Sequence, residues 1–590
     1  MKKIIYLLTV SLIFVGCEDF LDTTSYTTKD GSSFPKNEED ATQLVVGCYN
    51  NFSNNFEPFY SYMLFAECAC DDRLGGGGYH DRQPQAMCHL EFSDLDLTNN
   101  FWNRHYQGIA RENVTLEALE DLEQTPNIIH MKNEVKVLRA LNYFELVQLM
   151  GDVPLMREIP RSVQEARDSP PQATQEELFR FIAQDLWDAY NELPVERWNA
   201  LPSGTINKWY AAGLLARVYL FYTGFYSKET LPMESGGEVT REQVRAALEN
   251  LMNNSGHSLV PNFYSLWSYT SDVVKKDYPF AKDMPSWVRD SENPEHVFLR
   301  KGSKSNNRSP YNGNEFCLYW GVRNGGGQDY RKVFPLGEGW GFGPVNTTLW
   351  EQWIDDDPND LRRKASIWHF EEETYYDDVF ASDRSEVFLD ESTYAWGIDR
   401  QCEETGLWNK KIVATRAYGK GDGTGLWSAF TSHPEMYNNP TDHFQIGNAT
   451  DICLIRYADI LLMHSEITKT ADGMNAVRAR VNLPPVAYSD EALRKERRYE
   501  LAFEGLRWGD IRRWHIAEEV LPSIYGVRIY VEGNFTTERP QGTVRTPVDE
   551  RYRATKGFWM IPQTQIDLSF GVLKQNPGWG PEAAYGEWRE

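Results

Sequence analysis

The feature that most constrains the fold is a series of helix-length apolar patterns in the first 255 residues. These patterns have the spacing of amphipathic or buried helices and cover residues of about 38–53, 102–123, 130–150, 174–193, 206–226 and 240–253. Local signals mark their ends: Gly151 follows the third pattern, Pro194 follows the fourth, and Thr174 with Glu177 forms a capping box at the start of the fourth. The sequence therefore predicts a mainly α protein.

The segment NKWYAAGLLARVYLFYTGF indicates how these helices pack. It sets the small residues Ala211, Ala212 and Gly213 among bulky ones such as Leu215 and Tyr219. Small residues let neighbouring helices approach closely, as they do in arrays of stacked helix pairs. We therefore expect a stacked array of helix pairs, although no strict 34-residue period is readable.

The middle of the chain has a different character. Gly, Asn, Asp, Pro and aromatic residues dominate from about 256 to 450, and helical patterns return at DICLIRYADILLMHSEITKT. We expect helical units at about 38–255 and 451–515, and a loop-rich half with short strands at about 256–450 and 516–590. Loops carried on a rigid scaffold often hold function, so the ligand site is sought in the loop-rich half.

Charge and motifs exclude several classes of function. The formal net charge of −26 argues against nucleic-acid binding. The sequence contains no Walker A motif, no HExxH and no G-x-S-x-G, and GKGDGTG lacks the flanking strand and helix of a dinucleotide site. The many paired carboxylates do not by themselves define a glycosidase site. No catalytic constellation stands out in the sequence, and we predict no cofactor.

The N-terminus predicts export and lipidation. Lys2 and Lys3 precede an apolar run from Ile4 to Val15, which is too short to span a bilayer and ends in FVGC. This start resembles a bacterial lipoprotein signal, with residues 1–16 as signal peptide and Cys17 as the lipidated residue. An ordinary secretory signal is the alternative. Residues 17–36 are polar and predict a flexible tether.

Seven further cysteines leave the redox state open. Cys68, Cys70 and Cys88 lie near two histidines, His80 and His89, but their spacing is not a usual zinc pattern. We predict no metal. A disulfide across this region and unpaired thiols both remain possible at this level.

Several longer motifs together carry a resemblance to a known family. They are FVGCEDFLD, FWNRHYQGIARENV, KVLRALNYFELVQLMGDVPL, NKWYAAGLLARVYLF, IRYADILLMHSE, RRYELAFEGLRWGDIRRW and WMIPQTQIDLSFGVLKQNPGW. In this order they resemble the SusD/RagB family of outer-membrane glycan-binding lipoproteins. The resemblance implies four tetratricopeptide-like units joined to a loop-rich ligand half.

The resemblance also implies a function and a partner. Such proteins are helical superhelices that capture oligosaccharides at the cell surface and deliver them to a SusC-like TonB-dependent β-barrel transporter, on which they sit as a hinged lid. The resemblance implies that the chain is a binding protein and not an enzyme, with a lipid-anchored glycan-degrading enzyme as the alternative. The expected location is the outer membrane, lipid-anchored and facing the exterior. Import of peptides or glycoproteins by the same lid mechanism is an alternative that the sequence leaves open.

The candidate ligand residues come from the two regions on which the family's site draws. Trp and Tyr offer faces for sugar rings, while Asn, Asp and Arg offer hydrogen bonds to hydroxyls. The glycines at 75–78 allow the first loop either to approach a ligand closely or to move. The candidates are Asp72, Arg73, Tyr79, Arg82, Trp287, Tyr319, Trp320, Asn324 and Trp340.

The segment RRYELAFEGLRWGDIRRW, residues 497–514, combines dense charge with an apolar face. The pairs Glu504–Arg507 and Asp510–Arg513 have the i,i+3 spacing at which charges neutralise one another on a helix. We interpret the segment as a packed junction between the two halves, with Gly505 as a bend. A site for an anionic ligand is the alternative.

Overall fold

A computed structural model provides the structure of the protein. It describes residues 34–160, 172–289, 292–302, 313–323, 329–418, 426–429, 448–531, 533–538 and 546–585, together with Ser162 and Glu165. The predicted signal peptide, Cys17 and nearly all of the predicted tether lie outside these residues, and so does Asn324.

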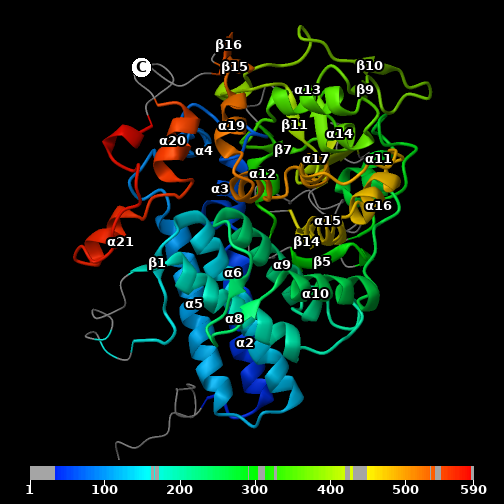
Figure 1. The fold of residues 1–590 in the computed structure, drawn as a ribbon. Coiled ribbons are helices and arrows are strands. Elements are labelled where there is room, and N and C mark those ends of the chain that lie inside the picture. Colours follow the sequence, from blue (N-terminus) through cyan, green and yellow to red (C-terminus); the bar gives the residue numbers. More distant parts are fainter. Residues whose placement is uncertain are drawn as a thin grey trace, which may run out of the picture.

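The helices of the first half form where the apolar patterns predict them (Figure 1). The expected capping box of Thr174 and Glu177 is present. The third predicted helix ends at Gly151, which caps it with a φ of 73°. The bounds in this half are α2 Glu38–Asn54, α3 Tyr62–Cys68, α4 Arg82–Cys88, α5 Asn99–Glu120, α6 Pro126–Met150, α8 Gln175–Glu192, α9 Lys208–Phe225 and α10 Arg241–Asn254.

These helices pack one upon the next. α2 contacts α5, α5 contacts α6, α6 contacts α8, α8 contacts α9 and α9 contacts α10. The later helix α15 (Tyr457–Thr468) packs on α10 and extends the array. A Cβ atom at Gly213 of α9 would lie 3.1 Å from Ile460 Cδ1, so the small residue is needed for this close approach. The predicted helical, tetratricopeptide-like fold is confirmed.

The remaining helices are shorter and frame the loop-rich half. They are α11 Asp272–Lys275, α12 Phe316–Tyr319, α13 Thr347–Asp356, α14 Leu361–Ser366, α16 Asp472–Arg480, α17 Asp490–Leu501, α18 Arg507–Arg513, α19 Ala517–Val520, α20 Val548–Thr555 and α21 Gln563–Leu568. No helix in the described part of the chain combines the length and the apolarity needed to cross a membrane.

Within the described residues the strands are short and form two-stranded sheets. All pairs are antiparallel except β6 with β7. The pairs are β1 Val153–Pro154 with β2 Gln172–Ala173, β3 Leu231–Pro232 with β4 Glu238–Val239, β5 His296–Arg300 with β14 Ile452–Arg456, β6 Val322–Arg323 with β7 Glu338–Gly339, β8 Ile367–His369 with β11 Leu407–Asn409, β9 Thr374–Tyr376 with β10 Glu386–Phe388, β12 Thr415–Tyr418 with β13 Leu426–Ala429, and β15 Arg528–Val531 with β16 Asn534–Thr537.

The segment 497–514 joins the two halves through buried ion pairs. It spans the end of α17, a bend at Gly505 with a φ of 77°, and α18. Toward the loop-rich half, Glu500 pairs with Arg362 at 3.1 Å and Glu504 pairs with Lys411 at 2.8 Å. Within the helical half, Arg497 pairs with Asp459 of α15 at 2.7 Å, and Arg507 pairs with Asp71 of the loop after α3 at 2.7 Å. Because Arg497 and Arg507 are matched by carboxylates, these contacts favour the interpretation of the segment as a packed junction.

One of the two predicted pairs within this segment is wrong. Arg513 does pair with Asp510, at 2.8 Å. Glu504, however, pairs with Lys411 and Arg456 from distant segments instead of with Arg507. The bend at Gly505 separates Glu504 from the helix that carries Arg507, so the i,i+3 relation does not apply.

Candidate functional site

The glycine loop, residues 75–78, is buried and tightly packed. Gly76 forms a β-bridge with Phe342, and Gly78 forms one with Gln401. A Cβ atom at Gly75 would lie 2.5 Å from Gln85 Cα, and one at Gly76, where φ is 66°, would lie 2.3 Å from Pro344 Cδ. The glycines therefore allow backbone to pack against backbone, and the loop is a rigid support in this structure.

An aromatic group lies beside this loop. Tyr319 at the end of α12 packs against Trp340, with ring centroids 4.8 Å apart, and against Phe342 at 5.1 Å. Trp340 keeps part of its surface exposed, whereas Tyr319 is almost fully buried. Burial raises the pKa of Tyr319, so its hydroxyl stays neutral at physiological pH.

Polar groups join the loop to these aromatics. Arg323 Nη1 lies 2.9 Å from Asp81 Oδ2 and also donates to the carbonyl of Trp340. Asp81 in turn accepts a hydrogen bond from the Gly78 N–H at 2.6 Å. Tyr79 lies within this turn and is half-buried. We call Tyr79, Asp81, Tyr319, Arg323 and Trp340 the aromatic platform.

Three predicted ligand residues lie in the interior. Arg73 is fully buried, with Nε 2.6 Å from Glu67 and its guanidinium 4.5 Å from the ring of Trp320. Asp72 is also buried and pairs with Arg498 at 2.7 Å. The expectation of ligand contact is therefore revised for Asp72, Arg73 and Trp320, because all three side chains are buried in the protein interior. Tyr319 is also buried, and its ring packs against Trp340 and supports it from the protein interior.

Two other predicted residues have side-chain contacts outside the platform. Arg82 at the start of α4 donates to the carbonyl of Tyr585 near the C-terminus. Trp287 borders a small cavity of about 50 Å³ together with Trp267 and Lys411. Of the described candidates, Tyr319 and Trp340 contact each other, and Tyr79 belongs to the turn that the Asp81–Arg323 ion pair joins to Trp340.

Comparisons with known proteins identify the chain's relatives. The profile of the SusD family matches residues 337–579, and a second profile, described as "Starch-binding associating with outer membrane", matches residues 19–220. The chain belongs to the SusD family. A SusD-like protein of Bacteroides ovatus is 24% identical over 46% of this chain, and the match spans 48% of that relative's own length. SusD-like protein P2 of Formosa agariphila is 23% identical over 88% of this chain and 92% of its own.

Solved structures of SusD-like proteins have the same fold. A laminarin binding SusD-like protein has a TM-score of 0.64 at 24% identity, and the match covers 92% of this chain and all of that chain. Surface glycan-binding protein A from Bacteroides thetaiotaomicron, in complex with laminarihexaose, has a TM-score of 0.63 at 18% identity over 91% of this chain and 99% of its own. At these identities the likeness establishes the fold alone.

The cysteines near the glycine loop of this SusD-family chain are buried thiols. Cys70 Sγ donates to the carbonyl of Glu67, and Cys88 Sγ donates to that of Arg73. Burial raises the pKa of the Cys68 thiol to about 12, so it stays protonated. The unpaired alternative therefore holds for these three cysteines.

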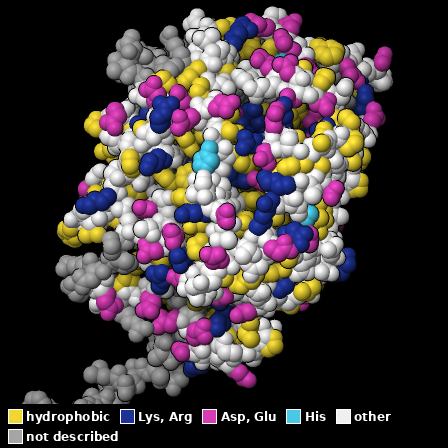
Figure 2. Space-filling model, viewed as in Figure 1, with side chains coloured by type: hydrophobic (Ala, Val, Ile, Leu, Met, Phe, Trp, Pro, Cys, Tyr) yellow, Lys and Arg dark blue, Asp and Glu magenta, His cyan; other side chains and the backbone are white. Residues whose placement is uncertain are grey.

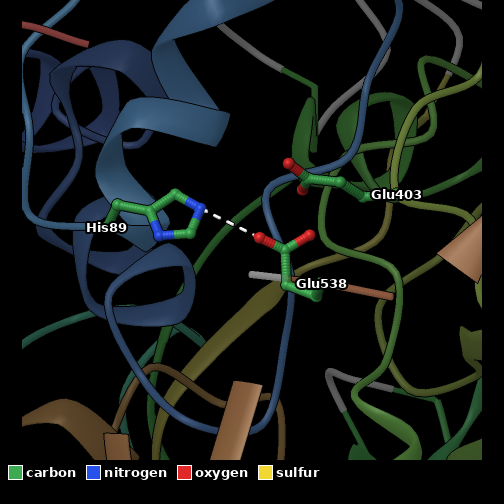
Figure 3. A group of neighbouring side chains, drawn as sticks. All are labelled: His89, Glu403 and Glu538. Atoms are coloured by element: carbon green, nitrogen blue, oxygen red, sulfur yellow. Dashed lines mark ion pairs between the residues drawn. The ribbon is translucent and has the colours of Figure 1, made fainter. Parts of the chain in front are cut away.

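Among the described residues, one histidine of that region meets two carboxylates. His89, Glu403 and Glu538 are all buried, and His89 Nε2 lies 3.2 Å from Glu538 Oε1 (Figure 3). Glu403 accepts a hydrogen bond from the Gly76 N–H at 2.8 Å. Their nitrogen and oxygen atoms, all within 4.8 Å of one another, are a donor set that a divalent cation accepts. The contacts also give these residues a structural role, because they hold the glycine loop to distant segments.

Sequence reasoning missed a groove between α13 and the β15–β16 hairpin. It has a volume of about 490 Å³, and its lining includes Trp396 and Phe535. The one local signal for it is a tryptophan next to Gly397 in a turn, a pattern that many loops of this chain share. The groove forms from segments more than 100 residues apart, so no sequence window contains it.

Proposed function

We propose that this protein binds oligosaccharides or polysaccharides at the cell surface and delivers them to a partner TonB-dependent transporter. The observation that carries the binding step is the aromatic platform, in which the partly exposed Trp340 and Tyr79 stand on a rigid loop pair beside the Asp81–Arg323 ion pair. Membership in the SusD family supports the proposal, as do the structural relatives whose titles name laminarin and laminarihexaose.

The chemistry of the platform suits a sugar. The faces of Trp and Tyr rings accept the C–H faces of pyranose rings, and bury large area at little conformational cost. Asp81 accepts hydrogen bonds from hydroxyls and Arg323 donates to them, while their mutual pairing leaves no strong net charge. The rigid loop means that little ordering is needed on binding. These features favour an uncharged, hydroxyl-rich ligand.

Replacing Trp340 by alanine is expected to weaken glycan binding by at least about tenfold, because a central stacking aromatic carries a large share of the binding energy. Affinity gel electrophoresis against a panel that includes laminarin and starch selects the glycan, and isothermal calorimetry then measures Kd for the wild type and for Trp340→Ala and Tyr79→Ala. Assay of reducing ends in the same mixtures distinguishes binding from hydrolysis.

The matched control for this experiment is Trp187→Ala, which removes a half-buried tryptophan of α8 in the helical array. This variant is expected to bind glycan as the wild type does. If the wild type binds no glycan of the panel, the proposed function is wrong. If it binds but Trp340→Ala and Tyr79→Ala bind equally well, the platform is not the site.

Lipidation at Cys17 and a β-barrel partner complete the proposal. The full-length chain is expected to incorporate labelled palmitate and to fractionate with outer membranes. A TonB-dependent transporter should copurify with it from these membranes in a stoichiometric amount. Cys17→Ala should lose the label and leave the membrane fraction. Equal labelling of the variant would reject Cys17 as the anchor, and a wild-type preparation free of any barrel protein would reject the partner.

A further inference from the structure

A groove separate from the aromatic platform has the composition of a second ligand site. It lies between the first turns of α13, the end of β8 and the β15–β16 hairpin, which Figure 1 shows at the top of the molecule. Its volume of about 490 Å³ falls within the range of roughly 300–1,000 Å³ that is usual for small-ligand pockets. None of the platform residues lines it.

The aromatic wall of the groove is held in place from behind. Trp396 packs edge-on against Phe370, with centroids 5.2 Å apart, and against Phe535 at 5.0 Å. Its Nε1 donates to the carbonyl of Glu391 at 3.1 Å, which fixes the orientation of the indole. Phe535 keeps 39% of its surface exposed although it lies on a two-stranded hairpin. Two aromatic side chains thus present fixed, partly exposed surfaces to the groove.

The polar groups of the groove supply both a donor and acceptors. His369 Nδ1 accepts the N–H of Glu371 at 3.2 Å, so in the neutral ring the proton resides on Nε2. Burial lowers the pKa of His369 to about 4, and the ring is therefore neutral at physiological pH. The carboxylates of Glu351 and Glu371 are exposed at the rim and accept hydrogen bonds.

The charges of the groove decide the class of ligand. Arg528 forms a two-bond ion pair with Glu391, at 2.8 and 2.9 Å, and its guanidinium lies 3.8 Å from the Phe535 ring. The cation is thereby neutralised, and the two rim carboxylates repel anions. On the face shown in Figure 2, acidic, basic and hydrophobic side chains are interspersed. Aromatic faces, a neutral donor and carboxylate acceptors together match a neutral polyhydroxylated chain.

We propose that this groove is a second carbohydrate-binding site, which takes a segment of a neutral oligosaccharide through Trp396 and Phe535. The ligand class rests on the proposed function, whereas the site is independent of the aromatic platform. Two sites on one protein let a polysaccharide bind bivalently, so the second contact adds avidity without changing the affinity of either site for a short fragment.

The experiment compares laminarihexaose with laminarin, as a short and a polymeric probe, on the full chain. If affinity gel electrophoresis shows that the protein binds starch, a short starch fragment and starch are used as the two probes instead. Calorimetry of the wild type with the hexasaccharide is expected to report two sites. Two variants, Phe535→Ala and Glu371→Ala, alter exposed side chains and should leave the melting temperature unchanged. Each is expected to weaken or remove hexasaccharide binding at one of the two sites. The Phe535→Ala variant should also bind the polymer at least about tenfold more weakly.

The outcomes separate this inference from the proposed function. The second site would be overturned if calorimetry reported a single hexasaccharide site that Trp340→Ala abolishes and that Phe535→Ala and Glu371→Ala leave unchanged. The proposed function would stand in that case. The second site would be established if the Trp340→Ala variant kept residual hexasaccharide binding and the Trp340→Ala/Phe535→Ala double variant lost it. A wild type that binds neither probe nor any other glycan of the panel would overturn both.

Discussion

The Glu500→Gln variant is expected to unfold far more easily than the wild-type protein. Glu500 is fully buried at the end of α17 and pairs with Arg456 at 3.0 Å, with Arg362 at 3.1 Å and closely with Arg480. Burial alone would raise the pKa of Glu500, but Arg480, Arg456 and Arg362 together hold it well below its usual range. The carboxylate is therefore the common counter-ion of three buried cations.

Removing that charge leaves the guanidinium groups in the interior with too few partners. Breaking one side of a buried ion pair typically costs about 3–5 kcal/mol, because the remaining charge is neither solvated nor matched. We expect a loss of that order in the free energy of unfolding, measured by urea denaturation followed by circular dichroism. Glutamine is isosteric with glutamate and fills the same volume. The loss of stability therefore measures the removal of the charge and not the creation of a cavity.

The control is Glu176→Gln on the exposed face of α8. Glu176 also pairs with an arginine, Arg180, at 2.8 Å, but both side chains are exposed. Exposed pairs contribute about 0–1 kcal/mol, so this variant should behave almost as the wild type. Equal denaturation midpoints for Glu500→Gln and Glu176→Gln would contradict the view that the buried charge of Glu500 stabilises the junction segment.

Acid is expected to destabilise the protein steeply between about pH 5 and pH 2. Asp459 of α15 is buried, and although burial opposes ionisation, Arg217 and Arg497 lower its pKa to about 2. Because the folded pKa lies below the unfolded one, the contribution of Asp459 to stability is complete above the unfolded pKa. It is lost as pH falls through the folded pKa. A shift of this size corresponds to roughly 2–3 kcal/mol.

Other junction carboxylates act in the same direction. Arg513 lowers the pKa of Glu466 against the opposing effect of burial, and Arg456 does the same for Glu504. Melting temperatures measured from pH 7 to pH 2 should therefore fall most in the acid range. Asp459→Asn should lower stability at pH 7 and flatten the acid slope, whereas Glu176→Gln should leave the slope unchanged. An identical slope in Asp459→Asn would rule out its part in acid unfolding.

A few buried carboxylates work against this trend at higher pH. Burial raises the pKa of Glu112 to about 8 and that of Glu404 to about 7. In these groups the folded state holds the proton more tightly, so their contribution to stability declines as pH rises from the unfolded pKa toward the folded one. Stability should accordingly reach its maximum on the weakly acid side of neutrality.

The helical half was predictable because its signals are local. Apolar spacing, the capping box at Thr174 and the stop at Gly151 each act within one or two turns, and the structure keeps all of them. The packing role of Gly213 followed from its small neighbours, since a close helix contact needs small side chains whatever the partner is.

The candidate site was predictable only in part. Tyr319 and Trp340 do contact each other, and Trp340 and Tyr79 keep part of their surface exposed. Asp72, Arg73 and Trp320, which come from the same two regions, are buried in the core. In irregular loops the side-chain direction follows no period, so neighbouring residues can differ completely in burial. The glycine loop likewise looked free to move, and its packing against residues 341–344 becomes visible only when both segments are present.

By itself, the sequence determined the helical scaffold, the family and the paired character of the junction segment. These properties depend on residue spacing along one helix or on motifs that are contiguous in the chain. Only the tertiary structure decided which charges pair, as with Glu504 and Lys411, and that a groove opens beside Trp396. Both depend on segments that lie far apart in the chain, and an interaction between such segments exists only once the chain between them has folded.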